Sequence, residues 1–113
     1  MLFDLPRTVL VRADDVPPSV ASPLTASVTA AGVQLTWGAP TLAPGVTVNG
    51  YIVERRRAGG STRFRPRTAS ITATTFLDEQ VVSGATYDYR LVMIDSNGMS
   101  WPALFQMVTA SIP

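Results

Sequence analysis

Short runs of alternating apolar and polar residues recur along the chain and are separated by Gly, Pro and Asn. Alternation with a period of two is typical of strands that bury one face, and no helical period is sustained. Several short strands with turn residues between them predict an all-β sandwich or barrel. The predicted strands are 24–29, 32–40, 51–57, 63–67, 70–78, the part of 84–103 that precedes Asn97, and 103–112.

The alternation also predicts which side chains face the core. The inward set is Ala26, Val28, Val33, Leu35, Trp37, Tyr51, Val53, Ile71, Phe76, Tyr87, Tyr89, Leu91 and Met93. Trp37, Tyr51, Tyr87 and Tyr89 are the large aromatic members, so we expect them to form the structural core. The segment 63–67 contains Pro66, which lacks a backbone N–H and therefore predicts an edge strand.

The first 22 residues differ from the rest of the chain. An apolar sequence, MLFDLPRTVLVR, is followed by the Pro-rich sequence DDVPPSVASP at 14–23. Asp4, Pro6 and Arg7 interrupt the apolar run, which therefore does not fit a signal peptide, and no stretch is long enough to span a membrane. We interpret 1–22 as an extended arm with a Pro-rich linker and 23–113 as a single domain.

Four segments of the domain follow the pattern of a known family. They are LTW followed by Pro40, GYIVERR, TTFLDEQVVSGATYDYRL and DSNGMSWPA. In these segments the chain resembles a fibronectin type III domain, in the form common in bacterial and phage proteins. The resemblance covers about Pro23 to Ile112 and implies a seven-stranded antiparallel immunoglobulin-like sandwich preceded by the N-terminal arm.

The resemblance assigns structural roles to individual residues. Tyr87 matches the family's tyrosine corner, in which the ring is buried and the hydroxyl bonds to the preceding loop. Asp78 is expected to accept backbone N–H groups after the fifth strand, and Gly84 to supply backbone freedom before the sixth. Asn97-Gly98 predicts a hairpin turn. These assignments make the clearest motif of the chain architectural rather than chemical.

Two residues depart from the family pattern. Arg55 has inward parity where an apolar residue is usual, so either its stem reaches the rim or that end of the sandwich is open. Ser83 stands where many relatives have Pro.

Composition excludes several classes of function. The chain has no His and no Cys, which removes the best-suited side chains for nucleophilic catalysis, zinc sites and haem ligation. We therefore expect no enzyme activity and no cofactor or metal. All nine cations are Arg and the net charge is +1, which argues against a nucleic-acid partner.

Six arginines lie between residues 55 and 67. The candidate anion contacts among them are Arg56, Arg63, Arg65 and Arg67. The alternative, which we favour, is that charge on edge strands prevents edge-to-edge pairing. The sequence DSNG at 95–98 has oxygen ligands at alternate positions, but the rest of a calcium loop is missing, and a turn is the better interpretation.

Two further groups are candidates for contact with a partner. Met99 and Trp101 flank the turn after the sixth strand, where Trp101 could meet a partner or fold over the sandwich as a lid. Ile52, Val92 and Ile94 have outward parity and could form an apolar interface, or be ordinary isolated surface residues.

The arm is the third candidate surface. Its apolar residues are Leu2, Phe3, Leu5, Val9, Leu10 and Val11. The segment could pair with an edge of its own sandwich, add a strand to a neighbouring subunit, or lie on a partner's surface; we favour the last two.

These features predict a non-enzymatic structural or interaction module. The concrete expectation is an accessory component of a phage particle, a decoration or tail protein that is made in the host cytoplasm and resides in the virion. The arm would bind capsid or tail proteins, and the exposed loops could contact a host-surface glycan or protein. The alternative is a linker or carbohydrate-associated module of a secreted bacterial enzyme. If the 113 residues are the whole gene product, nothing in them directs secretion.

Overall fold

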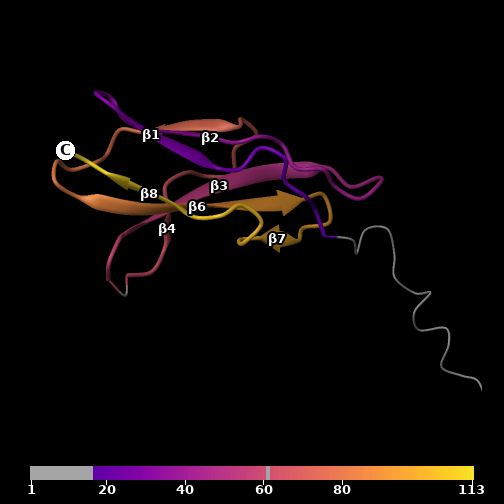
Figure 1. The fold of residues 1–113 in the computed structure, drawn as a ribbon. Helices are drawn as coiled ribbons and strands as arrows, with labels where there is room; N and C mark the ends of the chain where they lie inside the picture. The colour runs from indigo at the N-terminus through magenta and orange to yellow at the C-terminus, as the bar shows by residue number, and fades with distance from the viewer. Residues whose placement is uncertain (1–16, 61) are drawn as a thin grey trace, which may run out of the picture.

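A computed structural model describes residues 17–60 and 62–113, and in this part of the chain the strands form two stacked antiparallel sheets (Figure 1). The smaller sheet has the order β1-β2-β5. The larger has the order β4-β3-β6-β7, and β8 also pairs with β6. The bounds are β1 Thr25–Thr29, β2 Gly32–Thr36, β3 Val48–Arg57, β4 Arg65–Pro66, β5 Thr75–Asp78, β6 Thr86–Asp95, β7 Ser100–Trp101 and β8 Val108–Ser111. The predicted all-β sandwich is confirmed.

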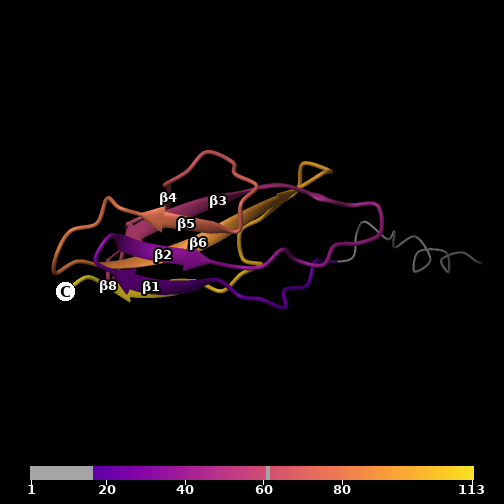
Figure 2. The same cartoon turned by 90° about the horizontal axis from the view of Figure 1, so that it is seen from above.

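The long strands β3 and β6 are the centre of the larger sheet. They pair from Val48 and Asp95 at one end to Arg57 and Tyr87 at the other, with one irregularity between Val48 and Gly50. Figure 2 shows the smaller sheet lying over these two strands, with β4 at the margin beyond β3. The larger sheet is therefore wider than the layer that covers it.

The core lies between the sheets and contains the predicted aromatic residues. Trp37, Tyr51, Tyr87 and Tyr89 are all buried, and the rings of Trp37 and Tyr51 meet edge to face with centroids 5.5 Å apart. The aliphatic residues predicted from β2, β3 and β6 are buried as well: Val33, Leu35, Val53, Leu91 and Met93. Ala26, Ile71 and Phe76 pack against this core from its margin.

The prediction that Val28 is buried is wrong, because its side chain is 41% exposed. Val28 is paired directly with Val33, which is fully buried, so its inward parity was right. It lies next to the last residue of β1, an edge strand, and thus at a corner of the sandwich. Parity determines the direction of a side chain but not whether another layer covers it.

The end of the chain also differs from the prediction. The strand expected at 103–112 is shortened to β8 at Val108–Ser111, and an additional strand, β7, precedes it at Ser100–Trp101; both pair with β6. Pro102 follows β7 directly and has no N–H to donate, so the pairing stops there. The sandwich therefore has eight strands instead of seven, two of them only two residues long.

The turns at both ends of β6 follow the predicted chemistry. Gly84 and Gly98 have φ angles of +83° and +81°, the left-handed region that favours glycine. The Gly98 N–H donates to the Asp95 carbonyl at 2.9 Å and closes the hairpin into β7.

The Pro-rich segment before β1 contacts the sandwich. Ser19 and Thr41 form a two-bond bridge, the Gly38 N–H donates to the Ser22 carbonyl, and Val20 packs against the core. Residues 19–22 therefore contact the folded domain, although they lie before the predicted domain start at residue 23.

Candidate functional site

Asp78 lies at the end of β5 and connects the two sheets. Its carboxylate accepts hydrogen bonds from Arg55 Nη1 at 2.8 Å, Arg67 Nη2 at 3.3 Å and the Tyr89 hydroxyl at 2.7 Å. The Gln80 N–H also donates to it, as predicted for the turn after β5. Asp78 is 1% exposed, so these bonds satisfy a carboxylate that is almost completely buried.

The hydrogen bonds around Asp78 determine its ionisation. Burial acts to raise the pKa of Asp78, but the bonds from Tyr89 and Arg55 and the charge of Arg55 outweigh it and hold the pKa below the usual range. For Tyr89, burial is the largest cause and the bond to Asp78 adds to it, so the pKa of its hydroxyl is strongly raised. The pair therefore consists of a carboxylate and a neutral phenol at neutral pH.

The inward parity of Arg55 places its guanidinium group at the end of the core, against Asp78 and Tyr87. Its Nη1 bonds to the Gln80 carbonyl at 2.7 Å as well as to Asp78, and its guanidinium carbon lies 4.3 Å from the centroid of the Tyr87 ring. Tyr87 itself forms the predicted corner, in which its hydroxyl accepts the Val82 N–H at 3.1 Å. An ion pair stacked on an aromatic ring therefore lies at this end of the core.

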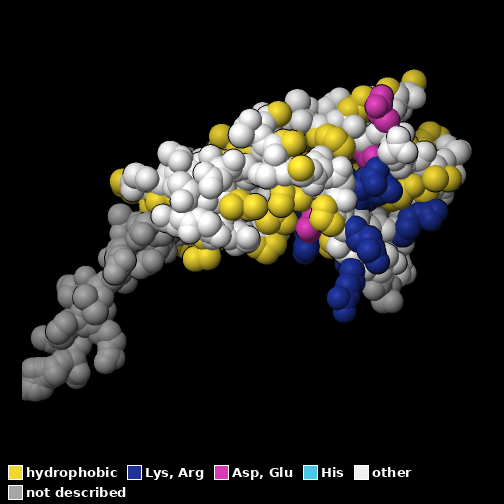
Figure 3. Space-filling model, turned by 180° about the vertical axis from the view of Figure 1, so that it is seen from behind, with side chains coloured by type: hydrophobic (Ala, Val, Ile, Leu, Met, Phe, Trp, Pro, Cys, Tyr) yellow, Lys and Arg dark blue, Asp and Glu magenta, His cyan; other side chains and the backbone are white. Residues whose placement is uncertain are grey.

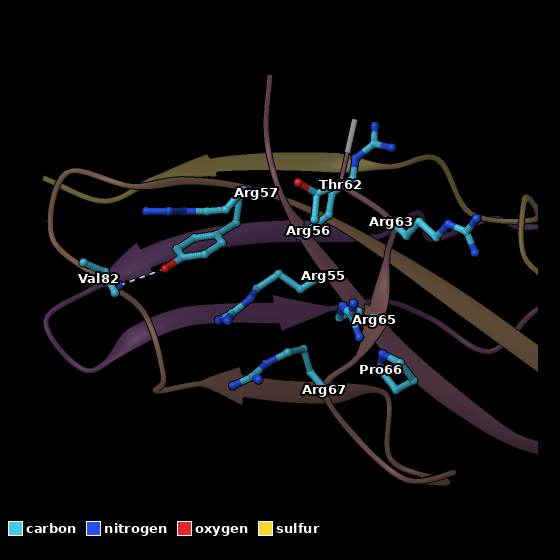
Figure 4. A pocket seen from close by; sticks show the side chains of 10 residues that line it. Arg55, Arg56, Arg57, Thr62, Arg63, Arg65, Pro66, Arg67 and Val82 are labelled. Atoms are coloured by element: carbon cyan, nitrogen blue, oxygen red, sulfur yellow. Dashed lines mark hydrogen bonds between the residues drawn. The ribbon is translucent and has the colours of Figure 1, made fainter. Parts of the chain in front are cut away.

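Beside this ion pair the arginines surround a hollow of about 400 Å³ (Figure 4). The hollow is lined by Arg55, Arg56, Arg57, Thr62, Arg63, Arg65, Pro66, Arg67, Val82 and Tyr87. Figure 4 shows the side chains of Arg55, Arg57 and Arg67 pointing in one direction, while that of Arg63 points away from them. Figure 3 shows the cations of the described residues gathered in one part of the face in view.

The four arginines predicted to contact an anion do not share one environment. Arg56 Nε donates to Asp88 at 3.0 Å, and its guanidinium lies over the Phe64 ring. Asp88 pairs with Arg56 across β3 and β6 on the outer face of the sheet, opposite to Arg55 and Arg57. Arg67 is bonded to Asp78, whereas Arg63 and Arg65 form no ion pair within the described residues.

Arg57 was not among the predicted contacts, yet it belongs with the inward-facing cations. Its guanidinium carbon is 5.5 Å from the Tyr87 centroid. Arg65 is paired with Arg55 across β3 and β4, and the Arg67 N–H donates to the Val53 carbonyl. The sequence already indicated that these arginines share one face of the larger sheet, because Arg occupies alternate positions at 55 and 57 and at 63, 65 and 67.

The loop after β6 is held by Asp95. Its carboxylate accepts the N–H groups of Asn97 and Met99 and the indole N–H of Trp101 at 3.0 Å, and these bonds, the indole bond foremost, lower its pKa. Trp101 is half-buried against the core, in agreement with its interpretation as a lid. Met99 remains 55% exposed.

The predicted apolar face on the larger sheet is mostly covered. Ile52 and Val92 are paired directly across β3 and β6 and shield one another, so that Val92 is buried and Ile52 half-buried. Ile94 is also half-buried. Leu2, Phe3, Leu5, Val9, Leu10 and Val11 of the predicted docking arm lie outside the described residues.

Among residues 17–60 and 62–113, no group of three metal-ligating side chains is found. The same ranges contain no helix with the length and apolar character needed to cross a membrane.

Comparison with known proteins identifies the family. No protein-family model matches the chain. The solved structure of an Fn3-like protein from Clostridium thermocellum is 30% identical, with a TM-score of 0.60, over 84% of this chain and 95% of that one. This chain belongs to the fibronectin type III-like family. The resemblance read from the four sequence segments is thereby confirmed at the level of the family.

Other relatives of this fibronectin type III-like domain are muscle proteins. Fast-type myosin-binding protein C from Gallus gallus is 29% identical over 97 residues, which are 86% of this chain and 9% of the relative. Titin module A71 from human cardiac muscle is 26% identical, with a TM-score of 0.59, over 76% of this chain and 81% of the module. The chain spans less than a tenth of the length of the curated relatives it matches.

Proposed function

We propose that this domain is a non-catalytic structural and interaction module that acts by binding other proteins of a larger assembly. The observation that carries the proposal is that the buried carboxylates of the described residues are engaged in hydrogen bonds that hold the fold together. Asp78, Asp88 and Asp95 are all buried, and each accepts several hydrogen bonds, Asp78 and Asp88 from other strands and Asp95 from the turn that follows it. Groups held in this way stabilise the sandwich, which leaves contact through the surface as the domain's means of action.

The more specific proposal is that the assembly is a phage particle and that the domain is an accessory component of its head or tail. Its support is the resemblance to the phage and bacterial form of the family, together with the low charged content of 15%. The apolar sequence of residues 2–11 supports docking through the arm, because such a segment gains free energy by burial against a partner. On this proposal the chain resides in the virion.

The test compares two variants that each remove three apolar side chains. In the arm variant Leu2, Phe3 and Leu5 are replaced by Ser. The matched control replaces Val28, Val82 and Met107, which are 41%, 58% and 48% exposed on the domain. Particles produced by the cells that carry the gene are separated on a density gradient, and the chain is quantified in the particle fraction. We expect the wild type and the control to be found with the particles and the arm variant to be lost from them.

Two results would contradict the proposal at different levels. Full incorporation of the arm variant would exclude docking through the arm while leaving a phage role intact. If the wild-type chain instead accompanies a secreted polysaccharide-degrading enzyme and no particle, the phage role is excluded and the accessory-module alternative is supported.

A further inference from the structure

Four arginines of the hollow share the inner face of the larger sheet, where the smaller sheet does not cover it. They are Arg55, Arg57, Arg65 and Arg67, called the arginine face below. β4 is the edge strand beyond β3, and here Arg57 and Arg65 are exposed while Arg55 and Arg67 are half-buried beside the end of β5. If the smaller sheet covered these cations, they would lower the stability of the fold, because burial of an unpaired charge is strongly unfavourable. The different widths of the two sheets thus create an open cationic surface.

The arginine face carries more positive charge than the fold uses. The acid bonded to its members is Asp78, which is shared by Arg55 and Arg67. Four guanidinium groups and one carboxylate leave a surplus of three positive charges. Arg57 and Arg65 form no ion pair within the described residues, and Arg67 Nε is buried without a hydrogen-bond partner there. Positive charges and N–H donors without a partner among the described residues therefore line the hollow.

Three of the four guanidinium groups, those of Arg55, Arg57 and Arg67, are also held in position before any ligand arrives. Asp78 fixes Arg55 and Arg67 from below, and the Tyr87 ring supports both Arg55 and Arg57. Because these side chains are already ordered, little side-chain entropy is lost when a ligand binds to them. This order distinguishes the arginine face from a set of freely moving surface cations.

From this arrangement we infer that the arginine face binds a phosphate group, either as a free dianion or as a monoester. Guanidinium groups donate paired hydrogen bonds to phosphate oxygens, and a phosphate carries nearly two negative charges at neutral pH. A carboxylate would neutralise only one of the three surplus charges. A hollow of about 400 Å³ has room for a phosphate with a small attached group. The inference does not depend on the virion role.

The test is a titration of the full chain at constant ionic strength, followed by NMR of the backbone and arginine Nε–H signals. The probes are inorganic phosphate, O-phosphoserine, glucose 6-phosphate and acetate. We expect shifts at Arg57, Arg65 and Arg67 with the phosphates and much weaker shifts with acetate. Tighter binding of an ester assigns the face to a phosphorylated ligand, and tighter binding of inorganic phosphate assigns it to the free ion.

Variants separate a specific site from general attraction. Arg57→Gln and Arg65→Gln leave the Asp78 cluster intact, and each is expected to weaken binding about tenfold, the effect of one charge-assisted hydrogen bond. Arg90→Gln is the charge-matched control, since Arg90 is bonded to Glu54 on the outer face of the same sheet. Binding of O-phosphoserine should also weaken as the pH falls below about 6, where the dianion gains a proton.

Either of two results would overturn the inference. One is acetate binding as tightly as O-phosphoserine, which would indicate a carboxylate ligand such as an acidic peptide. The other is an equal loss of phosphate binding in Arg90→Gln, which would show that net charge alone is responsible.

Discussion

Arg55 extends from β3 in one sheet to Asp78 at the end of β5 in the other, with 2.8 Å between Nη1 and Oδ2. The contact joins residues 23 positions apart and is reinforced by Arg67 and Tyr89. In most of the sandwich the sheets are held together by apolar packing, which has no preferred direction. This ion pair is directional, and it lies where the apolar core ends.

Replacing Asp78 should therefore destabilise the domain strongly. In Asp78→Asn the two arginines lose their shared carboxylate, and breaking a buried pair from one side costs about 3 kcal/mol or more. We expect this decrease in the free energy of unfolding by chemical denaturation. Glu79→Gln removes an exposed carboxylate from the adjacent position and should have little effect. A similar small loss in both variants would contradict the role of the cluster.

The same carboxylate predicts an acid-sensitive stability. The pKa of Asp78 is lower in the folded state than in the unfolded chain, so the folded state binds fewer protons. Its contribution is complete above the unfolded pKa of about 4 and is lost as the pH falls through the lower folded value. Unfolding free energies measured between about pH 6 and pH 2 should decrease less steeply in Asp78→Asn than in the wild type. Identical slopes would exclude Asp78 as a source of the acid sensitivity.

The tyrosine corner gives a prediction that isolates one hydroxyl. Tyr87→Phe removes the acceptor of the Val82 N–H, and the loss of one such partly buried hydrogen bond costs about 0.5–1.5 kcal/mol. Tyr51→Phe is the matched control in the same core, because no hydrogen bond to the Tyr51 hydroxyl is found among the described residues. Thermal unfolding should separate the two variants, with Tyr87→Phe the less stable. Equal melting temperatures would argue against the corner as a stabilising element.

A pair of valines tests the corner of the sandwich. Val28 and Val33 are directly opposed across β1 and β2, but Val28 is 41% exposed and Val33 is fully buried. Val33→Thr places a hydroxyl in the core and should cost about 1–3 kcal/mol, whereas Val28→Thr should change the stability by less than about 0.5 kcal/mol. Denaturant midpoints of the two variants provide the measurement. A large cost for Val28→Thr would mean that another part of the chain covers this corner.

The sequence predicted the parts of the fold that depend on local rules. Strand alternation identified Trp37, Tyr51, Tyr87 and Tyr89 as core, because side chains alternate between the two faces of any strand. Gly84 and Gly98 marked the turns, because few other residues adopt their backbone conformation. The tyrosine corner was expected from the resemblance to the family, and its bond joins two residues only five positions apart, Val82 and Tyr87.

Only the tertiary structure decided which side chains at the edges of the sheets are exposed and which are paired. The exposure of Val28 and the open arginine face both follow from where one layer stops covering the other, and the mutual shielding of Ile52 and Val92 follows from their pairing on the outer face. The bond between Arg55 and Asp78 depends on the same limit, since it forms at the uncovered end of the core. Alternation along a strand fixes only the side on which a residue lies. Burial and charge pairing also require the position of a second layer, and that position is set by the packing of the whole chain.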